Sequence, residues 1–540
     1  MPPIATKNSK KKNIAGSSTS AGNTAQGGLT RGAVSLIAIA TGAMLGLCAP
    51  GIGLWPLAWF GLAPLLLLSV SSRSVWSALW RGLLFGTSYT LVYANFLLGL
   101  QPLDWMGFGG WQGVLMAMAA WFILCTHQGV LICIFSGILR VLPLNGGFFL
   151  EKSKGYWRLP ALLVVPLLWQ LCVNKLGNAH DLLGIPWTLL EYSQYKQTAL
   201  IQICAIIGGI GLSCLIVMVN TALAAFIGAV WMKRVELSMS ASKRIHSVGH
   251  LIVCALIMCC VTLYGVWQTS THKEYSTIDT SILQGNINIE MQKTTHRYTL
   301  RELVSHYKHM LDSCPPGLCV WTENALPCYL NEEPDTAKEL SSIAESGKLD
   351  MVVGAMEKDA SGRPYNSAYG IGLDGKILPV VYHKRYLVPF GEYTPRIVQN
   401  FPEWILRLTN TPAGGGFESG KDPAILHLKC GAVAPLVCFE TLSPELVASS
   451  VRKGAQLLVN VSDLAWFHDS ICGEQMAAFS VLRAVENGRF FVFAANTGPS
   501  VIIDPTGRIT ASTAIGKERV LVGKAGFTAN VTPFTQWFIF

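Results

Sequence analysis

Long apolar segments fill the chain up to about residue 270, and short alternating runs of apolar and polar residues follow. A helix needs about 20 apolar residues to cross the ~30 Å hydrocarbon core of a bilayer. Windows of that length start near Ala33, Leu54, Gly82, Trp111, Leu159, Leu200 and Gly249. The pattern predicts a transmembrane domain of about seven helices over residues 33–270, the second and fifth being the shortest.

From Ile278 onward the periodicity is that of an α/β domain. Strands are predicted at 278–284, 317–322, 350–355, 367–373, 377–383, 432–438, 456–461, 491–496 and 499–503. The clearest helices are predicted at 298–313, 334–347 and 474–488. We therefore expect one globular domain over 277–527, followed by a short C-terminal remnant at 528–540.

The amino-acid composition supports a chain divided into a membrane region and an aqueous region. The chain has 540 residues, of which 51% are hydrophobic and 14% charged, and its mean hydropathy is +0.40. These values are too apolar for a soluble enzyme of this length. Residues 1–32 are rich in Ser, Gly, Ala, Thr and Lys, so we predict a disordered basic cytoplasmic tail. Because further apolar segments follow at once, an uncleaved first span is favoured over a signal peptide.

The chain has a formal charge of +9, and its basic residues are distributed as in a membrane protein. Cytoplasmic loops of membrane proteins hold most of the Lys and Arg. Such residues gather in the tail and in the second, fourth and sixth loops, with Arg73, Lys152 and Lys233 among them, whereas the loop around Asp104 has none. This alternation predicts that the tail lies inside and that everything after about residue 270 lies outside. No basic helix or aromatic-basic ladder indicates a nucleic-acid partner.

The 15 cysteines divide between the two regions. Those in apolar runs are interpreted as small buried hydrophobes. The polar region holds Cys314, Cys319, Cys328, Cys430, Cys438 and Cys472. They lack the paired CxxC spacing of a zinc site, so we expect no metal. The sequence is compatible with a disulfide, for example between Cys314 and Cys319, if this region faces an oxidising compartment.

Three polar residues each close an apolar strand: Glu323, Lys384 and Cys438. Strand ends are where a rigid sheet presents side chains to a shared cleft. A thiol becomes a strong nucleophile only beside a base or a positive charge. Glu323 is suited to take the thiol proton, and Lys384 to stabilise the oxyanion of a tetrahedral intermediate. Singly, each residue has an ordinary structural explanation; together they indicate acyl transfer.

Four ordered motifs resemble the apolipoprotein N-acyltransferase family, the membrane-bound branch of the nitrilase superfamily. They are LQGNI at 283–287, WTENALP at 321–327, YHKRYLVPFGEY at 382–393 and VCFE at 437–440. In the fifth loop, GIPW at 184–187 and YSQ at 192–194 are similar to that family's extracytoplasmic connection. The resemblance extends from the first span to about residue 527.

The resemblance implies a polytopic α-helical membrane domain plus an α/β nitrilase-like α-β-β-α sandwich. The sandwich would face the periplasm of a bacterial cell with the enzyme in the inner membrane. An acyl chain would pass from phospholipid to Cys438 and then to the α-amine of a diacylated apolipoprotein, in the last step of lipoprotein maturation. Glu323 matches the general base, Lys384 the oxyanion-stabilising lysine and Cys438 the nucleophile. We expect a monomer that needs no cofactor.

Supporting roles follow from the same resemblance. Glu392 matches a second essential glutamate and Glu440 the glutamate after the cysteine, although Glu440 is equally well explained as a structural carboxylate. Phe439 and Trp466 are expected to help position substrate. By contrast, the spacing of Arg483, Glu486 and Arg489 favours a structural charge network.

Departures from the family pattern are also present. Phe439 stands where the family often has Tyr, and Thr294 where it often has Trp. In the stretch that resembles the family's Asn-Asp-Ala-Trp-Phe, Asp463 and Leu464 replace the Asn and Asp. Substrate positioning is therefore less firmly predicted than the Glu/Lys/Cys triad. The family usually has one more span near residues 528–540, so either that helix is absent here or the sequence is incomplete.

Two other functions were weighed. A membrane-tethered nitrilase-type amidase would use the same triad but pass the acyl group to water; the large membrane domain disfavours it, because a lipid substrate needs lateral entry from the bilayer. A catalytically inactive lipoprotein-binding module is disfavoured by retention of Glu, Lys and Cys together. Thiol reactivity of Cys438 separates that module from an enzyme.

Overall fold

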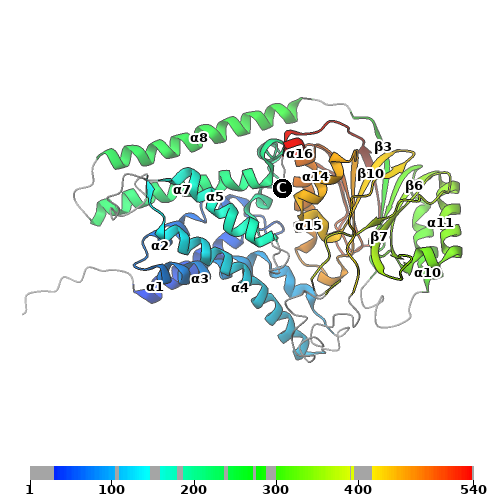
Figure 1. The fold of residues 1–540 in the computed structure, drawn as a ribbon, viewed down its shortest axis with the longest axis horizontal. Helices are drawn as coiled ribbons and strands as arrows, with labels where there is room; N and C mark the ends of the chain where they lie inside the picture. The colour runs from blue at the N-terminus through cyan, green and yellow to red at the C-terminus, as the bar shows by residue number, and fades with distance from the viewer. Residues whose placement is uncertain are drawn as a thin grey trace, which may run out of the picture.

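The computed structural model describes residues 30–103, 109–145, 159–178, 186–235, 241–271, 275–287, 299–389, 391–393 and 416–537. Its elements form two parts that lie side by side (Figure 1): a helical half up to residue 271 and a sandwich half from residue 275. Most of the predicted tail lies outside the described residues, as do Asp104, Lys152, Gly184, Ile185 and Thr294.

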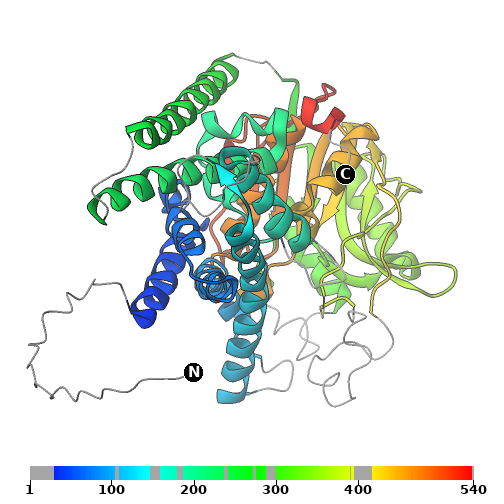
Figure 2. The ribbon, with the colours of Figure 1, turned by 60° about the vertical axis from the view of Figure 1, so that its left-hand side comes forward.

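The helical half consists of α1 (Arg31–Gly46), α2 (Ala63–Val70), α3 (Val75–Tyr93), α4 (Trp111–Val141), α5 (Ala161–Trp169), α6 (Thr198–Ile201), α7 (Cys204–Val235) and α8 (Ala241–Ser270). Short 3₁₀ segments join them, including η1 (Trp55–Trp59), η2 (Asn95–Leu100) and η7 (Leu190–Gln194). Both views place α8 along the outer edge of this half (Figures 1 and 2).

Apolar length identifies the strongest candidates for membrane spans. In the described part of the chain, three helices are long and apolar enough: Trp111–Val141, Cys204–Val230 and Val248–Ser270. Shorter apolar helical segments cover Arg31–Gly46, Trp55–Val70 and Ala161–Lys175. The window predicted near Gly82 falls on α3, which ends at Tyr93. The count of seven spans stays a prediction.

Two β-sheets form the sandwich half. One sheet has six strands in the order β14 (Ile509–Ser512), β13 (Val501–Ile503), β12 (Phe490–Ala495), β11 (Leu457–Ser462), β10 (Gly431–Val437) and β9 (Leu426–Leu428). The other has seven, in the order β15 (Arg519–Gly526), β3 (Thr277–Gln284), β4 (Gly317–Trp321), β6 (Leu349–Lys358), β7 (Pro364–Ile371) and β8 (Tyr382–His383), with β5 (Leu326–Tyr329) paired to β6. In each sheet the three central strands are parallel, so their carboxyl ends share one edge.

Helices cover the outer faces of both sheets. On the seven-stranded sheet lie α10 (Leu300–Leu311), which starts at a Thr299–Glu302 capping box, and α11 (Pro334–Gly347). On the six-stranded sheet lie α14 (Pro444–Arg452) and α15 (Cys472–Asn487). Aliphatic side chains from both sheets, such as Val320 and Val459, share the core between them. The predicted α-β-β-α sandwich is confirmed (Figure 1).

The predicted strand 377–383 is wrong over most of its length. Only Tyr382–His383 pairs with β7, and Ile377 makes an isolated bridge to Ile371. Pro379 falls within the stretch and has no N–H to contribute to a ladder. The sequence analysis also missed the elements β5, β9, β14, β15 and α14.

The two halves share one continuous hydrophobic core. Helix α15 packs against β12 on its inner side and against α7 and η7 on the other. Aromatic rings bridge the boundary: Trp187 stacks on Phe96 of the helical half at 4.6 Å between ring centroids and meets Phe479 of α15 at 5.1 Å. The sandwich half therefore packs tightly against the helical half.

Candidate active site

Lys384 lies between two carboxylates. Its Nζ donates to Glu392 Oε1 at 2.9 Å and to Glu323 Oε1 at 3.2 Å. Lys384 is 1% exposed and Glu323 is 6% exposed. An ammonium withdrawn from water to this degree needs such partners, because an unpaired buried charge is costly.

Sheet topology explains how these residues meet. Glu323 follows β4 and Lys384 follows β8, both in the seven-stranded sheet. Gly354 lets the segment that carries Glu323 pass close to β6, because a Cβ at residue 354 would lie 2.8 Å from the Glu323 Cα. The second oxygen of Glu323, Oε2, accepts from the Asp463 N–H at 2.8 Å. Glu323 is thus held by both sheets.

Cys438 stands on a tight turn at the end of β10. Its φ of +50° is rare for a residue with a side chain and costs about 1–3 kcal/mol. This residue begins the short 3₁₀ helix η9 (Cys438–Leu442), and its carbonyl accepts from Asn460 Nδ2 at 3.0 Å. The surrounding fold therefore stabilises a strained backbone at the proposed nucleophile.

Electrostatics assign different protonation states to the thiol and the amine. Burial raises the pKa of Cys438, and the nearby Glu323 carboxylate raises it further. Lys384 and a hydrogen bond to Ser462 lower this pKa but do not outweigh the burial. Burial alone would lower the pKa of Lys384, but Glu323 and Glu392 outweigh it and raise that pKa. At neutral pH the resting pair is a thiol and an ammonium. A thiol in this state needs a base before it can act as a nucleophile, and an ammonium cannot serve as that base.

Asn366 on β7 was missed by the sequence analysis. Its Nδ2 donates to Glu323 Oε1 and to Glu392 Oε1, each at 2.8 Å, so one amide ties the two carboxylates together. The other oxygen of Glu392 accepts from the Val388 N–H at 2.8 Å. Asn366 is the third residue of β7 and lies just before the strand predicted at 367–373, and nothing in the local sequence signals a site.

Glu440 is the centre of a separate hydrogen-bond set. It accepts from the backbone N–H groups of Val437 at 2.7 Å, Arg385 at 2.6 Å and Tyr386 at 3.2 Å, and from the Tyr382 hydroxyl at 2.7 Å. These bonds join η9, which carries the proposed nucleophile and is called the nucleophile turn below, to the segment that follows Lys384. The structural interpretation of Glu440 fits this arrangement.

The two aromatic candidates occupy different places. Phe439 is buried, with its ring 5.3 Å from that of Tyr386 and 5.8 Å from that of Trp187. Trp466 is half-buried in the 3₁₀ turn η10 (Ala465–Phe467). Phe439 therefore contacts the boundary between the halves as well as the nucleophile turn.

Two further predictions have structural outcomes. Arg483 and Glu486 form the expected buried ion pair, but Arg489 instead donates to backbone carbonyls, including that of Ala455 at 2.8 Å. Cys314 and Cys319 are free thiols that hydrogen-bond to each other, so no disulfide joins them in this structure.

Known proteins similar to this chain cover both halves. A family model described as carbon-nitrogen hydrolase matches residues 280–525, and one described as apolipoprotein N-acyltransferase N-terminal domain matches residues 41–222. The apolipoprotein N-acyltransferase of Geobacter metallireducens is 32% identical over 496 residues, covering 91% of this chain and 88% of the relative. The apolipoprotein N-acyltransferase of Gloeobacter violaceus is 27% identical over 507 residues, covering 93% of this chain and 90% of the relative. The crystal structure of a carbon-nitrogen hydrolase from Helicobacter pylori shares 17% identity over 46% of this chain and 89% of that one, with a TM-score of 0.37.

Proposed function

The chain belongs to the apolipoprotein N-acyltransferase family, and we propose that Cys438 carries the acyl chain between a phospholipid and the lipoprotein. The protein is a membrane-associated acyltransferase with a lipoprotein substrate. The proposal concerns the donor, the intermediate and the residues that handle them. Its main support is the placement of Lys384 between Glu323 and Glu392, where all three influence the charge state of Cys438.

In the first half-reaction, the Cys438 sulfur attacks the ester carbonyl of the phospholipid while Glu323 takes the thiol proton. Negative charge develops on the carbonyl oxygen, where the Lys384 ammonium stabilises it. The tetrahedral intermediate expels the lysophospholipid alcohol, which receives the proton from Glu323. A thioester on Cys438 remains.

In the second half-reaction, the free α-amine of the diacylated lipoprotein attacks the thioester. Glu323 takes a proton from the attacking nitrogen, and the Cys438 sulfur leaves and is reprotonated. Glu392 holds Lys384 in place through the 2.9 Å contact. Glu440, which joins the nucleophile turn to the segment after Lys384, is assigned a positioning role.

We assign residues 33–270 to the membrane domain and residues 277–527 to the catalytic domain. The alternation of basic residues among the loops supports an enzyme in the inner membrane whose catalytic domain faces the periplasm. That side is where a lipoprotein amine is available after export. A single chain supplies Glu323, Lys384 and Cys438, which supports a monomer as the working unit.

The decisive test withholds the second substrate. Purified protein incubated with phospholipid alone should gain an acyl-chain mass on the peptide that contains Cys438, cleaved by neutral hydroxylamine. A diacylated lipopeptide with a free N-terminus should discharge it, whereas water should do so slowly. Cys438→Ala should abolish the adduct and Glu323→Gln should slow its formation. Cys430→Ala, which removes a half-buried thiol at the opposite end of β10, is the matched control and should leave it unchanged.

An adduct on another residue, or acyl transfer that persists in Cys438→Ala, would refute the covalent role of this cysteine. Discharge by water as fast as by the amine would instead favour hydrolysis.

A further inference from the structure

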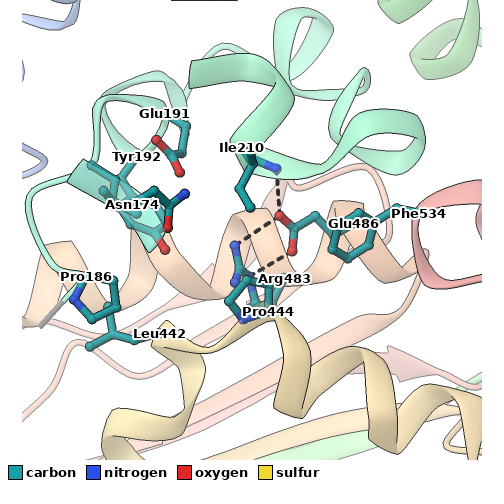
Figure 3. Close-up of a pocket in the computed structure, with 12 residues that line it drawn as sticks. Asn174, Pro186, Glu191, Tyr192, Ile210, Leu442, Pro444, Arg483, Glu486 and Phe534 are labelled. Carbon is teal, nitrogen blue, oxygen red and sulfur yellow. Dashed lines mark hydrogen bonds and ion pairs between the residues drawn. The ribbon is translucent and has the colours of Figure 1, made fainter. Parts of the chain in front are cut away.

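A small cavity lined by both apolar and charged side chains lies at the boundary between the two halves (Figure 3). Glu191 of η7 faces it from the helical half, and Arg483 and Glu486 face it from α15 of the sandwich half. Leu442, the last residue of the turn η9 that starts at Cys438, also lines it. The cavity therefore touches the nucleophile turn without containing the nucleophile.

Glu486 joins the halves through a break in α7. Gly208 has φ +68° inside this helix, and the N–H of Gly209 donates to Glu486 Oε1 at 2.8 Å. A carboxylate is favoured at such a helix start, where free N–H groups and the helix dipole are positive. A Cβ at Gly209 would lie 3.2 Å from Glu191 Cγ and 3.2 Å from Glu486 Oε1, so the bare glycine lets both carboxylates approach. Arg483 Nε completes the set at 3.0 Å from Glu486 Oε2.

Four polar side-chain atoms of these residues have no hydrogen-bond partner among the described residues: Glu191 Oε2, Arg483 Nε, Arg483 Nη1 and Glu486 Oε2. Arg483 Nε and Glu486 Oε2 face each other as an ion pair at 3.0 Å, which leaves Glu191 Oε2 and Arg483 Nη1. Their side chains are buried, at 2% and 1% exposure. The cavity that both residues line has room for roughly one water molecule, and an acceptor and a donor supply the polar partners that an internal water needs.

We propose that this cavity is a hydrated joint between the halves, in which a water molecule bridges Glu191 to Arg483, and that Glu191 is thereby a positioning residue for the turn that carries Cys438. The second part rests on the proposed function of Cys438, whereas the joint itself does not.

Two contacts link the joint to the nucleophile turn. Leu442 reaches the cavity directly. Trp187, in the same connection as Glu191, has its ring 5.8 Å from that of Phe439 and donates its Nε1 hydrogen to Gln475 of α15. A shift of this connection is therefore transmitted to the residue beside Cys438.

Protonation of Glu191 makes the joint testable. Burial raises the pKa of Glu191 from 4.5 to about 7, although Ser213 and Arg483 act to lower it. The folded state thus binds this proton more tightly than the unfolded chain, so stability falls as pH rises from about 4.5 to about 7 and stays lower above that. Other titratable groups near Glu191 are Glu486, Arg483, Glu445, Tyr192, Cys204, Cys214, Cys48, Tyr89 and Tyr93.

The test compares the wild type with Glu191→Gln, which mimics the protonated form. The thermal midpoint of the detergent-solubilised full chain should fall in the wild type relative to the variant as pH rises, with the change complete near pH 7. The rate of acyl-adduct formation on Cys438 should show an inflection near the same pH in the wild type only. Glu332→Gln is the matched control, because Glu332 is an exposed carboxylate paired with Lys358 at 2.9 Å; it should keep both inflections.

The two measurements separate the parts of the proposal. Identical thermal curves for wild type and Glu191→Gln would overturn the joint. A difference in unfolding with no difference in the pH profile of acylation would overturn the positioning role. If no variant forms an adduct, the proposed function fails, while the unfolding comparison still decides the joint.

Discussion

Lys384 Nζ lies 2.9 Å from Glu392 Oε1, inside a site where the lysine is 1% exposed. Because a second carboxylate, that of Glu323, lies on the same ammonium at 3.2 Å, the lysine is fixed from two directions. An ammonium has enough N–H donors to serve both acceptors and still meet an oxyanion. This geometry supports the proposed role of Lys384 as a compact hydrogen-bond donor.

The first prediction uses this compactness. Lys384→Arg keeps the positive charge but introduces a planar fork that does not fit between two carboxylates set for an ammonium. Loss of an oxyanion donor typically lowers the rate by about 10²–10³-fold, and we expect an effect of that order. Single-turnover formation of the acyl adduct measures it.

Lys358→Arg is the control for that substitution. Lys358 also pairs with a carboxylate at 2.9 Å, but at the surface, so its replacement should leave the rate unchanged. Near-normal turnover of Lys384→Arg would mean that the site uses Lys384 only as a generic charge.

The position at the end of a strand indicated two members of the candidate triad. Glu323 and Cys438 each follow a short apolar strand that is visible in the sequence. The two strands belong to different sheets, so the sequence did not show how the two residues meet. The same argument has a weaker basis for Lys384, because most of the strand predicted before it is not a strand. The motif around Lys384, rather than periodicity, identified it.

Residues that act through tertiary contacts could not be predicted from the sequence. Asn366 bonds Glu323 and Glu392, which are 43 and 26 positions away in the chain. Glu191 faces Arg483 only because α15 of one half docks on η7 of the other. No local pattern encodes such pairings, because they depend on how separately folded layers meet.

The second prediction concerns orientation. The alternation of Lys and Arg among the loops predicts that the tail lies inside and the sandwich half outside. A reporter enzyme that is active only outside the cytoplasm should therefore be active when fused after about residue 275. Fused in the loop at Lys152, which lies outside the described residues, it should be silent. The reverse result would remove the periplasmic site.

The last prediction concerns Asn366, whose single Nδ2 donates to Glu323 and Glu392 at 2.8 Å each. Asn366→Leu keeps the branched shape of the side chain but removes both hydrogen bonds, so the two carboxylates and the Lys384 between them are held less firmly. A hydrogen bond to a charged group is worth about 1.5–3 kcal/mol, which corresponds to roughly a 10- to 100-fold slower acylation. Single-turnover adduct formation should show this loss. Asn331→Leu, at an exposed Asn that bonds the Lys358 backbone, should not slow acylation. An unchanged rate in Asn366→Leu would show that the Val388 and Asp463 N–H groups suffice to hold the two carboxylates.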